Sequence, residues 1–474
     1  MVVGDISTGT ELLVIGGGPG GYVAAIRGGQ LGLDVTLVEA EAYGGTCLNE
    51  GCIPSKAFIH VSDLAHEVEN AEPMGLYARA DVDMQGLVGW KDGVVSQLTD
   101  GVEKLSKANG VNLIEGRAEF VDDRTARVVH GGEGQGSESI EFEHAVIATG
   151  SCPVELPGFE FDGDRVLSSA DALSLESLPE SLLVVGGGYI GMELSTAFAK
   201  LGSDVTVVEI LDDVLPGYDE EITRLVRDRA EELGIDFRFG EAAQGWQTAD
   251  DAARVTTETE DGTVHEYDAE RVLVAVGRQP ASDTCSVESA DLKPNDDGVI
   301  ETDDSTRTPV EHIHAVGDVA GEPMLAHKAY REGRVAAEVI AGEPSRLDQQ
   351  AIPAAVFTDP EIGSVGLNAE EAEAEGFDPV VGEMPMHASG RALTLGAEDG
   401  FVRIIADAET EFVLGARIVA PDASELIAEV GLAIEMGAQL ADIAATVHTH
   451  PTLSEAVAEA AANARGSAIH TLNR

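Results

Sequence analysis

Short apolar runs followed by glycines recur along the chain, and they set the pattern of predicted elements. Residues 13–15 and 183–185 are two such runs, and each leads into a glycine-rich turn. An apolar run of this length that ends at a turn predicts a buried strand, and the stretch after each turn predicts a helix. Strands that alternate with helices are typical of a parallel sheet covered by helices. The pattern therefore predicts an α/β protein.

The same pattern occurs twice. Residues 13–21 (LVIGGGPGG) resemble residues 183–191 (LVVGGGYIG), and residues 31–39 (LGLDVTLVE) resemble residues 201–209 (LGSDVTVVE). Each copy predicts a strand, a glycine turn, a helix and a second strand that ends in an acid. Because both segments are shifted by the same number of residues, the chain holds two copies of one unit.

Both turns have the spacing G-x-G-x-x-G that dinucleotide-binding folds use. In such a turn the first glycine permits the tight bend, the second lets a pyrophosphate approach, and the third lets helix pack on strand. The six glycines are Gly16, Gly18, Gly21, Gly186, Gly188 and Gly191. The phosphates are expected at the helix N-terminus, and Glu39 and Glu209 are expected to accept hydrogen bonds from ribose hydroxyls. The repeat thus predicts two bound dinucleotides.

Further strands complete the predicted units. Residues 145–150 and 272–277 are apolar runs that end at Gly150 and Gly277, and each is expected to close one nucleotide-binding half. From about residue 350 strand-like runs alternate with alanine-rich helical runs. That change in pattern predicts a separate α+β domain.

Charge narrows the classes of partner. Asp and Glu number 86 against 29 Lys and Arg, which gives a formal net charge of −57. Such a chain repels nucleic acids and anionic membranes, so both are excluded as partners. At about 1 M salt the screening length falls to roughly 3 Å and self-repulsion fades. The composition favours a protein of a salt-loaded cytoplasm, as in a halophile, over an acidic mesophilic enzyme.

Location and redox state follow from what the sequence lacks. Residues 1–11 have no basic region followed by an apolar core, and no run approaches 18 uncharged apolar residues. We therefore expect a cytoplasmic protein without a membrane span. Four cysteines in 474 residues are too few for a disulfide scaffold. Any close pair is then expected to be catalytic or metal-binding.

One close pair exists. Cys47 and Cys52 lie in residues 44–56 (GGTCLNEGCIPSK). A zinc site would need two more ligands at a suitable spacing, and none follows, so no metal is expected. We interpret the pair as a redox-active dithiol, with two ordinary buried cysteines as the alternative.

Two nucleotide sites and a dithiol together imply a two-electron relay. A nicotinamide moves a hydride and a dithiol moves two electrons, and a flavin is the usual go-between, so the first site is expected to hold FAD. Residues 210–212, which follow Glu209, include no arginine for a 2′-phosphate. The second site is therefore expected to hold NAD rather than NADP.

On these residues the chain resembles the pyridine nucleotide–disulfide oxidoreductases nearly from end to end. Residues 44–56 are similar to the redox motif of that family, and residues 324–329 (MLAHKA) and 448–455 (HTHPTLSE) also match it. Residues 53–56 are typical of the branch that acts on lipoamide. Glu50 departs from the pattern, because a small apolar residue is usual there. The resemblance implies NAD+-dependent oxidation of dihydrolipoyl groups.

The resemblance also implies four catalytic residues. Cys47 would exchange sulfur with the substrate, and Cys52 would face the flavin as the charge-transfer thiolate. His450 would be the general base, and Glu455 would hold its imidazole. In the family this His–Glu pair reaches the disulfide from the partner subunit, so the resemblance implies a homodimer. The implied substrate carrier is a lipoyl-bearing protein of a 2-oxoacid dehydrogenase complex.

Other roles are implied around the cofactors. Lys56 and Glu193 would pair near the flavin ring, and Asp318 would contact the ribityl or phosphate groups of FAD. Cofactor contacts are further implied for Thr46, Ala118 and Ala326.

The implied fold is α/β, with two Rossmann-like nucleotide-binding domains and a C-terminal α+β dimerisation domain. The predicted boundaries are 1–150 for the FAD domain, 151–277 for the NAD domain, 278–350 for a central domain that completes the FAD site, and 351–474 for the interface domain. Another NAD(P)H-dependent flavin disulfide reductase and a non-catalytic flavoprotein are the alternatives. Ser55 and Glu209 disfavour the glutathione reductase branch, which usually has a lysine and an NADP site instead.

Overall fold

The computed structural model describes residues 7–131 and 136–473, which form two compact units. The first unit holds the chain up to Leu178 together with Leu273–Asp348, and the second holds Pro179–Val272 and Gln349–Arg474. Each unit is therefore discontinuous in sequence. The four-domain boundaries stay predictions, and residues 1–6 of the segment considered for a targeting signal lie outside the described residues.

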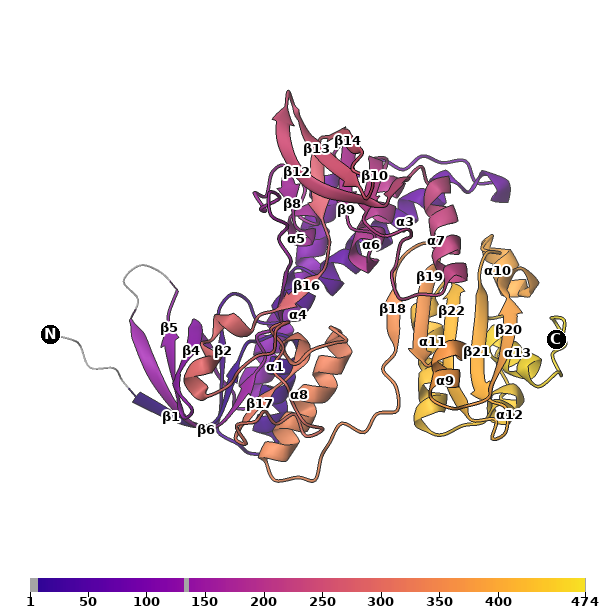
Figure 1. Ribbon diagram of the computed structural model, residues 1–474. Helices are drawn as coiled ribbons and strands as arrows, with labels where there is room; N and C mark the ends of the chain where they lie inside the picture. The colour runs from indigo at the N-terminus through magenta and orange to yellow at the C-terminus, as the bar shows by residue number, and fades with distance from the viewer. Residues whose placement is uncertain (1–6, 132–135, 474) are drawn as a thin grey trace. The chain divides into compact units, whose positions relative to one another are not determined.

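A seven-stranded sheet organises the first unit. Its strands are β1 (Ser7–Ile15), β2 (Val35–Glu39), β3 (Asn112–Glu115), β4 (Arg117–Asp122), β5 (Thr125–Val129), β6 (Ser137–Ile147) and β17 (Ile313–Ala315). The order is β3-β2-β1-β6-β5-β4, and β17 also pairs with β6. Strands β3, β2, β1, β6 and β17 run parallel, as the strand–helix alternation predicts (Figure 1).

Strand β6 pairs with two strands in succession. Its residues 137–141 pair antiparallel with β5, and its residues 145–147 pair parallel with β17. Strand β1 covers its other edge over both stretches. One long strand thus joins the parallel sheet to the antiparallel strands β4 and β5.

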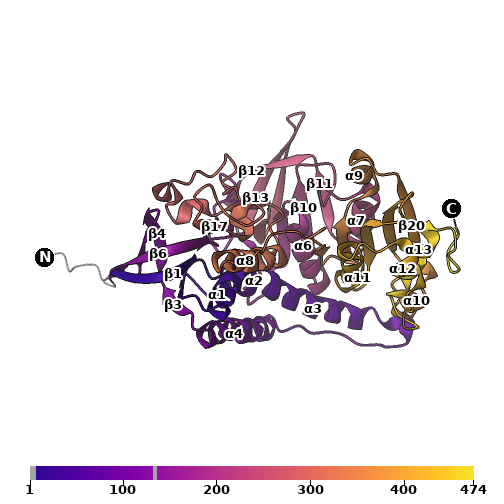
Figure 2. The same ribbon diagram turned by 90° about the horizontal axis from the view of Figure 1, so that it is seen from below.

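Helices cover one face of this sheet. They are α1 (Pro19–Gln30), α2 (Gly45–Asn49), α3 (Cys52–Glu69), α4 (Met84–Ala108) and α8 (Ala326–Ile340). Leu12, Val14 and Leu37 face them in one buried cluster, and Leu13 and Ile15 face the opposite layer, which includes β4 and β5. Alternate side chains of a strand point to opposite faces, so both faces of β1 are buried. Figure 2 shows α1 and α4 beside this sheet.

Helices α1 and α8 pack closely. A Cβ atom on Gly333 of α8 would lie 2.2 Å from the carbonyl oxygen of Gly20 in α1. Only glycine permits this approach. The contact brings together two helices that are far apart in sequence (Figure 1).

Short elements complete the first unit. They are α5 (Ser169–Ala172), β7 (Ser151–Pro153), β8 (Val166–Leu167), β16 (Arg278–Pro280) and the single turns η1 (Glu72–Met74), η2 (Ser282–Thr284), η3 (Val287–Ala290) and η4 (Gly317–Ala320). Strands β7 and β16 pair antiparallel. This pairing places Ser151 beside the chain that follows Gly277.

The second copy of the repeat begins the second unit. Its elements are β9 (Ser181–Val185), α6 (Tyr189–Leu201), β10 (Asp204–Glu209), α7 (Glu220–Glu232), β11 (Asp236–Phe239), β12 (Glu241–Ala249), β13 (Ala252–Thr259) and β14 (Val264–Ala269). Strands β11, β10 and β9 are parallel, and β12, β13 and β14 form an antiparallel sheet. Strand β15 (Arg271–Val274) then leads out of this segment.

An antiparallel sheet forms the C-terminal part of the second unit. Its strands are β18 (Ala354–Val356), β19 (Glu361–Gly366), β20 (Pro379–Pro385), β21 (Phe401–Asp407) and β22 (Val413–Ala420), in the order β18-β19-β22-β21-β20. The helices are α9 (Ala369–Ala374), α10 (Gly390–Leu395), α11 (Ala423–Glu435), α12 (Leu440–Ala445) and α13 (Glu455–Ala464), with the turn η5 (Met386–Ala388). Helices α11 and α13 pack on the sheet and share its core. The α+β pattern expected after residue 350 is thereby confirmed.

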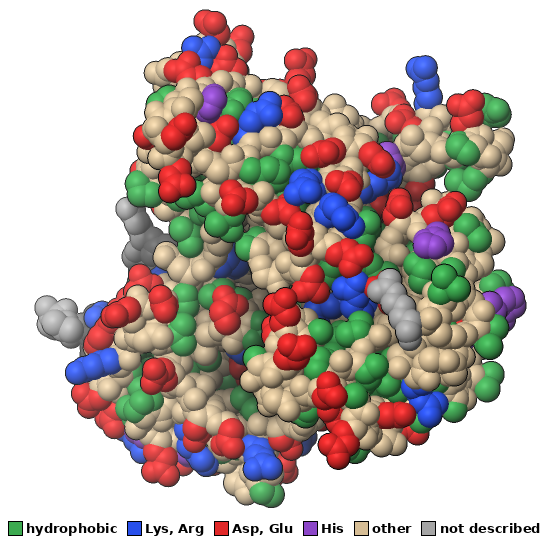
Figure 3. All heavy atoms as spheres, turned by 45° about the vertical axis from the view of Figure 1, so that its right-hand side comes forward, with side chains coloured by type: hydrophobic (Ala, Val, Ile, Leu, Met, Phe, Trp, Pro, Cys, Tyr) green, Lys and Arg blue, Asp and Glu red, His purple; other side chains and the backbone are tan. Residues whose placement is uncertain are grey.

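Acidic residues are spread along the whole sequence and are not confined to one segment. Figure 3 shows Asp and Glu side chains spread over the visible face, with fewer Lys and Arg between them. No helix in the described ranges is long and apolar enough to cross a membrane.

Candidate active site

The first glycine turn joins β1 to α1. Gly16 has φ +101°, and a Cβ there would lie 2.3 Å from the carbonyl oxygen of Ala148. A Cβ on Gly21 would lie 1.8 Å from the carbonyl oxygen of Gly16, whereas one on Gly18 would meet only Cα of Gly45, at 3.8 Å. The backbone therefore needs the first and third glycines, and the space beside the second is left for a ligand.

The second turn repeats this division. Gly186 has φ +108°, and a Cβ on Gly191 would lie 2.0 Å from the carbonyl oxygen of Gly186. A Cβ on Gly188 would meet nothing within 4 Å. Each turn thus offers open space at a helix N-terminus, where free N–H groups favour phosphate.

The two predicted acids also occupy equivalent places. Glu39 accepts the backbone N–H of Gly17 at 2.6 Å, and Glu209 accepts that of Gly187 at 2.6 Å. Each bond ties the end of the second strand to the glycine turn. Both carboxylates are held beside the space that a ribose would occupy, so the residues fit a dinucleotide at each turn.

Orphan polar atoms lie around the first turn. The hydroxyls of Tyr43 and Thr149 are buried and have no hydrogen-bond partner in the part of the chain that the structure describes. A Cβ on Gly17 would lie 3.1 Å from the Tyr43 ring, and one on Gly16 would lie 3.2 Å from the Thr149 backbone nitrogen. Buried polar groups normally have partners, so these hydroxyls fit a polar ligand such as FAD.

Asp318 sits in η4 and is linked to two residues that sequence reasoning missed. Ser151 Oγ donates to Asp318 Oδ2 at 2.5 Å, and Arg278 Nε donates to Ser151 Oγ at 2.8 Å. Three separate segments meet there. The one available signal was the position of Arg278 directly after the predicted Gly277.

A buried ion pair holds the Asp318 turn. Glu332 Oε2 accepts the N–H of Gly317 at 2.6 Å, and Lys328 lies 3.0 Å from Glu332 and donates to the carbonyl of Gly321 at 2.9 Å. All four groups belong to α8 or to the turn η4 and its end. The pair therefore fixes the backbone on both sides of Asp318.

The remaining predicted cofactor contacts lie in varied settings. Gly150 (φ +72°) and Gly277 (φ +132°) both have open space where a Cβ would be. Thr46 is exposed on α2, Ala326 begins α8, and Ala118 is a buried core residue of β4. Their roles as cofactor contacts stay predictions.

The two predicted redox thiols lie next to each other. Cys47 is in α2, and Cys52 is the first residue of α3. A hydrogen bond with Cys52 raises the pKa of the Cys47 thiol, burial raises it further, and Lys56 opposes the shift. Cys47 is therefore protonated at neutral pH. Cys52 stands at the N-terminus of an 18-residue helix, where the helix dipole favours a thiolate.

The thiol segment packs against the first glycine turn. Gly45, two residues before Cys47, has φ +58°, and a Cβ there would lie 2.6 Å from Cα of Gly18. A side chain at Gly45 would displace one of these segments. The dithiol is thus anchored to the turn that fits FAD.

His450 and Glu455 come together in the second unit. His450 Nδ1 lies 3.0 Å from Glu455 Oε1. The hydrogen bond from the backbone N–H of Thr452 lowers the pKa of Glu455, and the hydrogen bond with His450 lowers it further. An ionised Glu455 can only accept, so Nδ1 carries the proton and Nε2 is left to take one. The His450 side chain is 81% exposed.

Glu193 lies on α6 and is buried. Its carboxylate accepts the N–H of Phe357 at 2.9 Å. Lys56 belongs to the first unit and lies on α3. The pairing of Lys56 with Glu193 stays a prediction.

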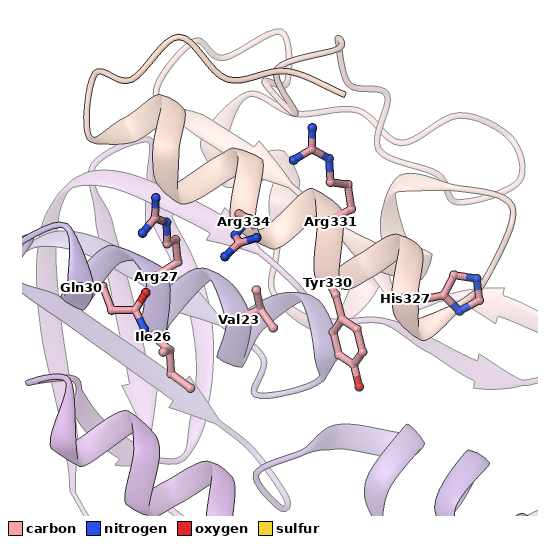
Figure 4. Close-up of a pocket in the computed structure, with 8 residues that line it drawn as sticks. All are labelled: Val23, Ile26, Arg27, Gln30, His327, Tyr330, Arg331 and Arg334. Atoms are coloured by element: carbon pink, nitrogen blue, oxygen red, sulfur yellow. The ribbon is translucent and has the colours of Figure 1, made fainter. Parts of the chain in front are cut away.

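A cavity of about 410 Å³ lies between α1 and α8. Figure 4 shows Val23, Ile26, Arg27 and Gln30 from α1 facing it, and His327, Tyr330, Arg331 and Arg334 from α8. On both helices these positions follow the spacing i, i+3, i+4, i+7, which puts them on one face. The sequence did not predict this cavity, because the residue pattern of each helix does not reveal that the other helix lies opposite it.

One residue of the cavity, Tyr330, belongs to an aromatic pair. The rings of Tyr22 and Tyr330 lie 6.0 Å apart. Burial raises the pKa of Tyr330, and the neighbouring Cys47 and Cys52 raise it further. Cys47 packs in the same buried cluster as Tyr22. The electrostatic influence of the thiols on Tyr330 places the cavity and the dithiol in the same region of the first unit.

Within residues 7–131 and 136–473, no group of three or more His, Cys, Asp or Glu side chains is placed to hold a metal ion. Cys47, Cys52, Cys152 and Cys285 are thiols, and none of these four forms a disulfide bond.

Known proteins match this chain throughout. Residues 10–333 match the family described as pyridine nucleotide-disulphide oxidoreductase, and residues 352–461 match its dimerisation domain. Dihydrolipoyl dehydrogenase 2 of Haloarcula marismortui is 68% identical over 99% of this chain and 100% of its own length. The dihydrolipoyl dehydrogenase of Haloferax volcanii is 66% identical over the full length of both chains.

Solved structures agree. LpdA from Mycobacterium tuberculosis matches with a TM-score of 0.89 at 28% identity, over 95% of this chain and 99% of that one. The HOCl-induced flavoprotein disulfide reductase RclA from Escherichia coli matches with a TM-score of 0.84 at 27% identity, over 95% and 99%.

Proposed function

The chain belongs to the pyridine nucleotide-disulphide oxidoreductase family, and on that premise we propose that it oxidises dihydrolipoyl groups with NAD+. The observation that carries the proposal is the pair of adjacent thiols, Cys47 and Cys52, packed against a glycine turn that fits FAD. Relatives named dihydrolipoyl dehydrogenase, 66–68% identical over nearly the whole chain, support it.

The cofactors are assigned to the two turns. FAD would be held by the turn at Gly18 with Glu39 and Asp318, and NAD by the turn at Gly188 with Glu209. When bound, the flavin supplies a two-electron path between the dithiol and the nicotinamide. The absence of arginine among residues 210–212 supports NAD over NADP.

The protein's own residues carry the sulfur chemistry. His450 Nε2 takes the proton of one substrate thiol, and the resulting thiolate attacks Sγ of Cys47 in the Cys47–Cys52 disulfide. The S–S bond breaks, and Cys52 leaves as a thiolate at the start of α3. The substrate's second thiol then attacks the substrate sulfur of the mixed disulfide. The lipoyl ring closes, Cys47 leaves with one proton, and the second proton passes to solvent through His450.

The raised pKa of Cys47 is consistent with a mechanism in which His450, rather than the thiol itself, supplies the base. The hydrogen bond with Cys52 and burial keep Cys47 protonated, so in the reverse reaction Cys47 needs a base before it can attack an oxidised lipoyl ring. Glu455 holds the imidazole of His450 in the tautomer that accepts a proton. Base and thiols therefore depend on each other for turnover.

The first test is NAD+ reduction by dihydrolipoamide in molar KCl. We expect rapid NADH formation that Cys47→Ser abolishes, with no activity toward NADP+ or glutathione as the controls. An FAD-loaded protein that fails to turn over dihydrolipoamide would contradict the proposal and direct the search to other disulfide substrates.

We further propose a homodimer in which His450 of one subunit serves the thiols of the other. The match of residues 352–461 to a dimerisation domain supports it. Cys47→Ser and His450→Gln variants, each inactive alone, would be mixed and allowed to exchange subunits. Half of the dimers are then hybrids with one intact site, so about a quarter of wild-type activity should return. No recovery would place base and thiols in one subunit.

The natural substrate is proposed to be a lipoyl group on a carrier protein of a 2-oxoacid dehydrogenase complex, in the cytoplasm. A cysteine content too low for a disulfide framework supports that compartment.

A further inference from the structure

Cationic side chains gather at the cavity between α1 and α8. The chain has 29 Lys and Arg against 86 Asp and Glu. Three arginines, Arg27, Arg331 and Arg334, nevertheless lie among the eight residues that line this cavity, and His327 is a fourth basic side chain. Because they lie on one face of each helix, these side chains form part of the cavity lining (Figure 4). In the rest of the chain acidic residues outnumber basic ones, so this concentration of arginines sets the cavity apart.

The three arginines are not equivalent. Arg27 is 26% exposed and lies 2.8 Å from Glu338, with Glu343 at 3.6 Å, so two carboxylates neutralise it. Its role is to tie α1 to α8 and to the chain that follows α8. It has little capacity left for a ligand.

Arg331 and Arg334 face solvent. Arg334 is 58% exposed, and its ion pair with Glu338 is long, at 3.8 Å. Arg331 is 39% exposed and pairs with Asp348 at 2.8 Å through one of its nitrogens. A guanidinium has five N–H donors. Both side chains therefore keep donors that can reach a ligand at the cavity.

The cavity also has an apolar, aromatic side. Val23 and Ile26 line it with Tyr330, whose ring lies 6.0 Å from that of Tyr22, and Tyr22 packs in the same buried cluster as Cys47. In Figure 4, Arg331 and Tyr330 point in opposite directions from α8. A long apolar arm that ends in a dithiol would fit beside Tyr330, while the group that carries the arm would stand near the arginines.

Electrostatics restricts that group. A surface of net charge −57 repels any other acidic protein, and a protein that works in the same concentrated salt needs a similarly acidic surface. At about 1 M salt, screening confines attraction to roughly 3 Å, so only direct contacts discriminate. Arginine binds carboxylates through paired N–H groups at such distances.

We propose that Arg331 and Arg334 bind carboxylates that flank the lipoyl-lysine of an acidic carrier protein. The cavity would thereby select a protein-borne dihydrolipoyl arm over one on a neutral carrier. This inference rests on the proposed function, because it assigns a partner to the same site. It does not depend on which complex supplies the carrier.

The test uses three synthetic peptides, each with a reduced lipoyl-lysine at its centre. One has two glutamates on each side, the second has glutamines, and the third has lysines. With the full-length, FAD-loaded protein in 2 M KCl, we expect kcat/KM for the glutamate peptide to exceed that for the glutamine peptide about tenfold. The Arg331→Gln, Arg334→Gln double variant should bring this ratio close to one.

Two further variants make the result specific. Arg127→Gln with Arg254→Gln removes the same charge from β5 and β13 and should leave the ratio at the wild-type value. Arg331→Glu with Arg334→Glu should reverse the preference, so that the lysine peptide becomes the better substrate. A wild-type ratio near one, or a ratio unchanged in the double glutamine variant, would overturn the inference.

Failure of the proposed function can be recognised separately. Free dihydrolipoamide carries no carboxylate and reports that function alone. If it is not oxidised, calorimetric binding of the peptides in their disulfide form still tests the arginines. Tighter binding of the glutamate peptide by wild type than by the double glutamine variant would support the inference, and equal binding would overturn it.

Discussion

At the scale of single residues, two histidines two positions apart stand in opposite environments. The His448 side chain is 8% exposed and its Nε2 lies 2.8 Å from Glu429, whereas the His450 side chain is 81% exposed and bonded to Glu455. Both sit before the helix α13. His448 packs beside Glu429, whereas His450 keeps the exposure that its proposed role as a base requires.

Substitution should separate the two roles. His450→Gln is expected to lower kcat by roughly 10²–10⁴, the range of general base catalysis, with an unchanged unfolding temperature. His448→Gln is expected to keep most activity and to cost about 1 kcal/mol of unfolding free energy, because it disturbs a buried hydrogen bond. NADH formation and thermal unfolding measure both. Loss of activity in His448→Gln without loss of stability would contradict this assignment.

A buried histidine predicts a pH dependence of stability. His314 on β17 is buried, its Nδ1 lies 2.9 Å from Thr306 Oγ1, and burial, aided by Arg307, lowers its pKa from 6.5 to about 4. The unfolded chain binds a proton near pH 6.5, and the folded chain binds it only near pH 4. The stability from this group is complete above about pH 6.5 and is lost as pH falls toward 4.

The expected size can be measured by difference. Between pH 7.5 and 5.0, His314 should account for about 2 kcal/mol of the fall in unfolding free energy. Urea unfolding of His314→Asn should show a fall smaller by that amount, and the exposed-site control His60→Asn should behave as wild type. Equal pH slopes in wild type and His314→Asn would refute the assignment.

At the scale of elements, the three glycines of each turn have different duties. The Cβ distances put Gly21 in contact with backbone and leave Gly18 and Gly188 next to open space. A methyl group at Gly21 therefore opposes folding, and one at Gly18 or Gly188 opposes only a ligand. The motif G-x-G-x-x-G shows three identical residues and does not reveal this difference.

Alanine substitutions should sort accordingly. Gly21→Ala is expected to abolish folded protein, and Gly18→Ala to give folded protein without flavin. Gly188→Ala should retain the flavin and raise KM for NAD+ about tenfold or more, equal to about 1.4 kcal/mol. Flavin absorbance, circular dichroism and NAD+ titration measure these outcomes, with Gly89→Ala as the control. A flavin-loaded, folded Gly21→Ala protein would contradict the steric argument.

Local sequence patterns predicted much of the fold but less of the candidate site. The repeat revealed both strand–turn–helix units because each is encoded within about 25 residues of contiguous chain. The sequence did not predict that β6 pairs with both β5 and β17. Both partners use the same edge of β6, and no local pattern indicates which of them pairs with which part of that edge. The sequence did not predict the cavity or the Ser151–Asp318 hydrogen bond, because each joins segments that are far apart in the chain.

At the scale of the whole molecule, charge governs the solution state. A net charge of −57 leaves the surface dependent on salt for screening. Because acidic side chains cover the visible face, repulsion between them is widespread (Figure 3). The same repulsion acts between the subunits of the proposed homodimer.

Salt removal should therefore dissociate and inactivate the protein. Lowering KCl from about 2 M to 0.1 M is expected to lower the unfolding temperature and to shift sedimentation from dimer to monomer. Equal ionic strength supplied by NaCl is the control for a specific potassium effect. Full activity after long dialysis without salt would refute this expectation.

The interleaved order of the two units has a consequence for biosynthesis. Strand β6 leaves the ribosome early, but its parallel neighbour β17 and the helix α8 are made only after the segment Pro179–Val272. Until then residues 145–147 of β6 lack their partner β17, and the α1 surface at Gly20 lacks α8. Unpaired edges of this kind are the points at which nascent chains aggregate. Translation past residue 340 is thus the moment when the first unit can close, and a chain truncated before it would need a chaperone to stay in solution.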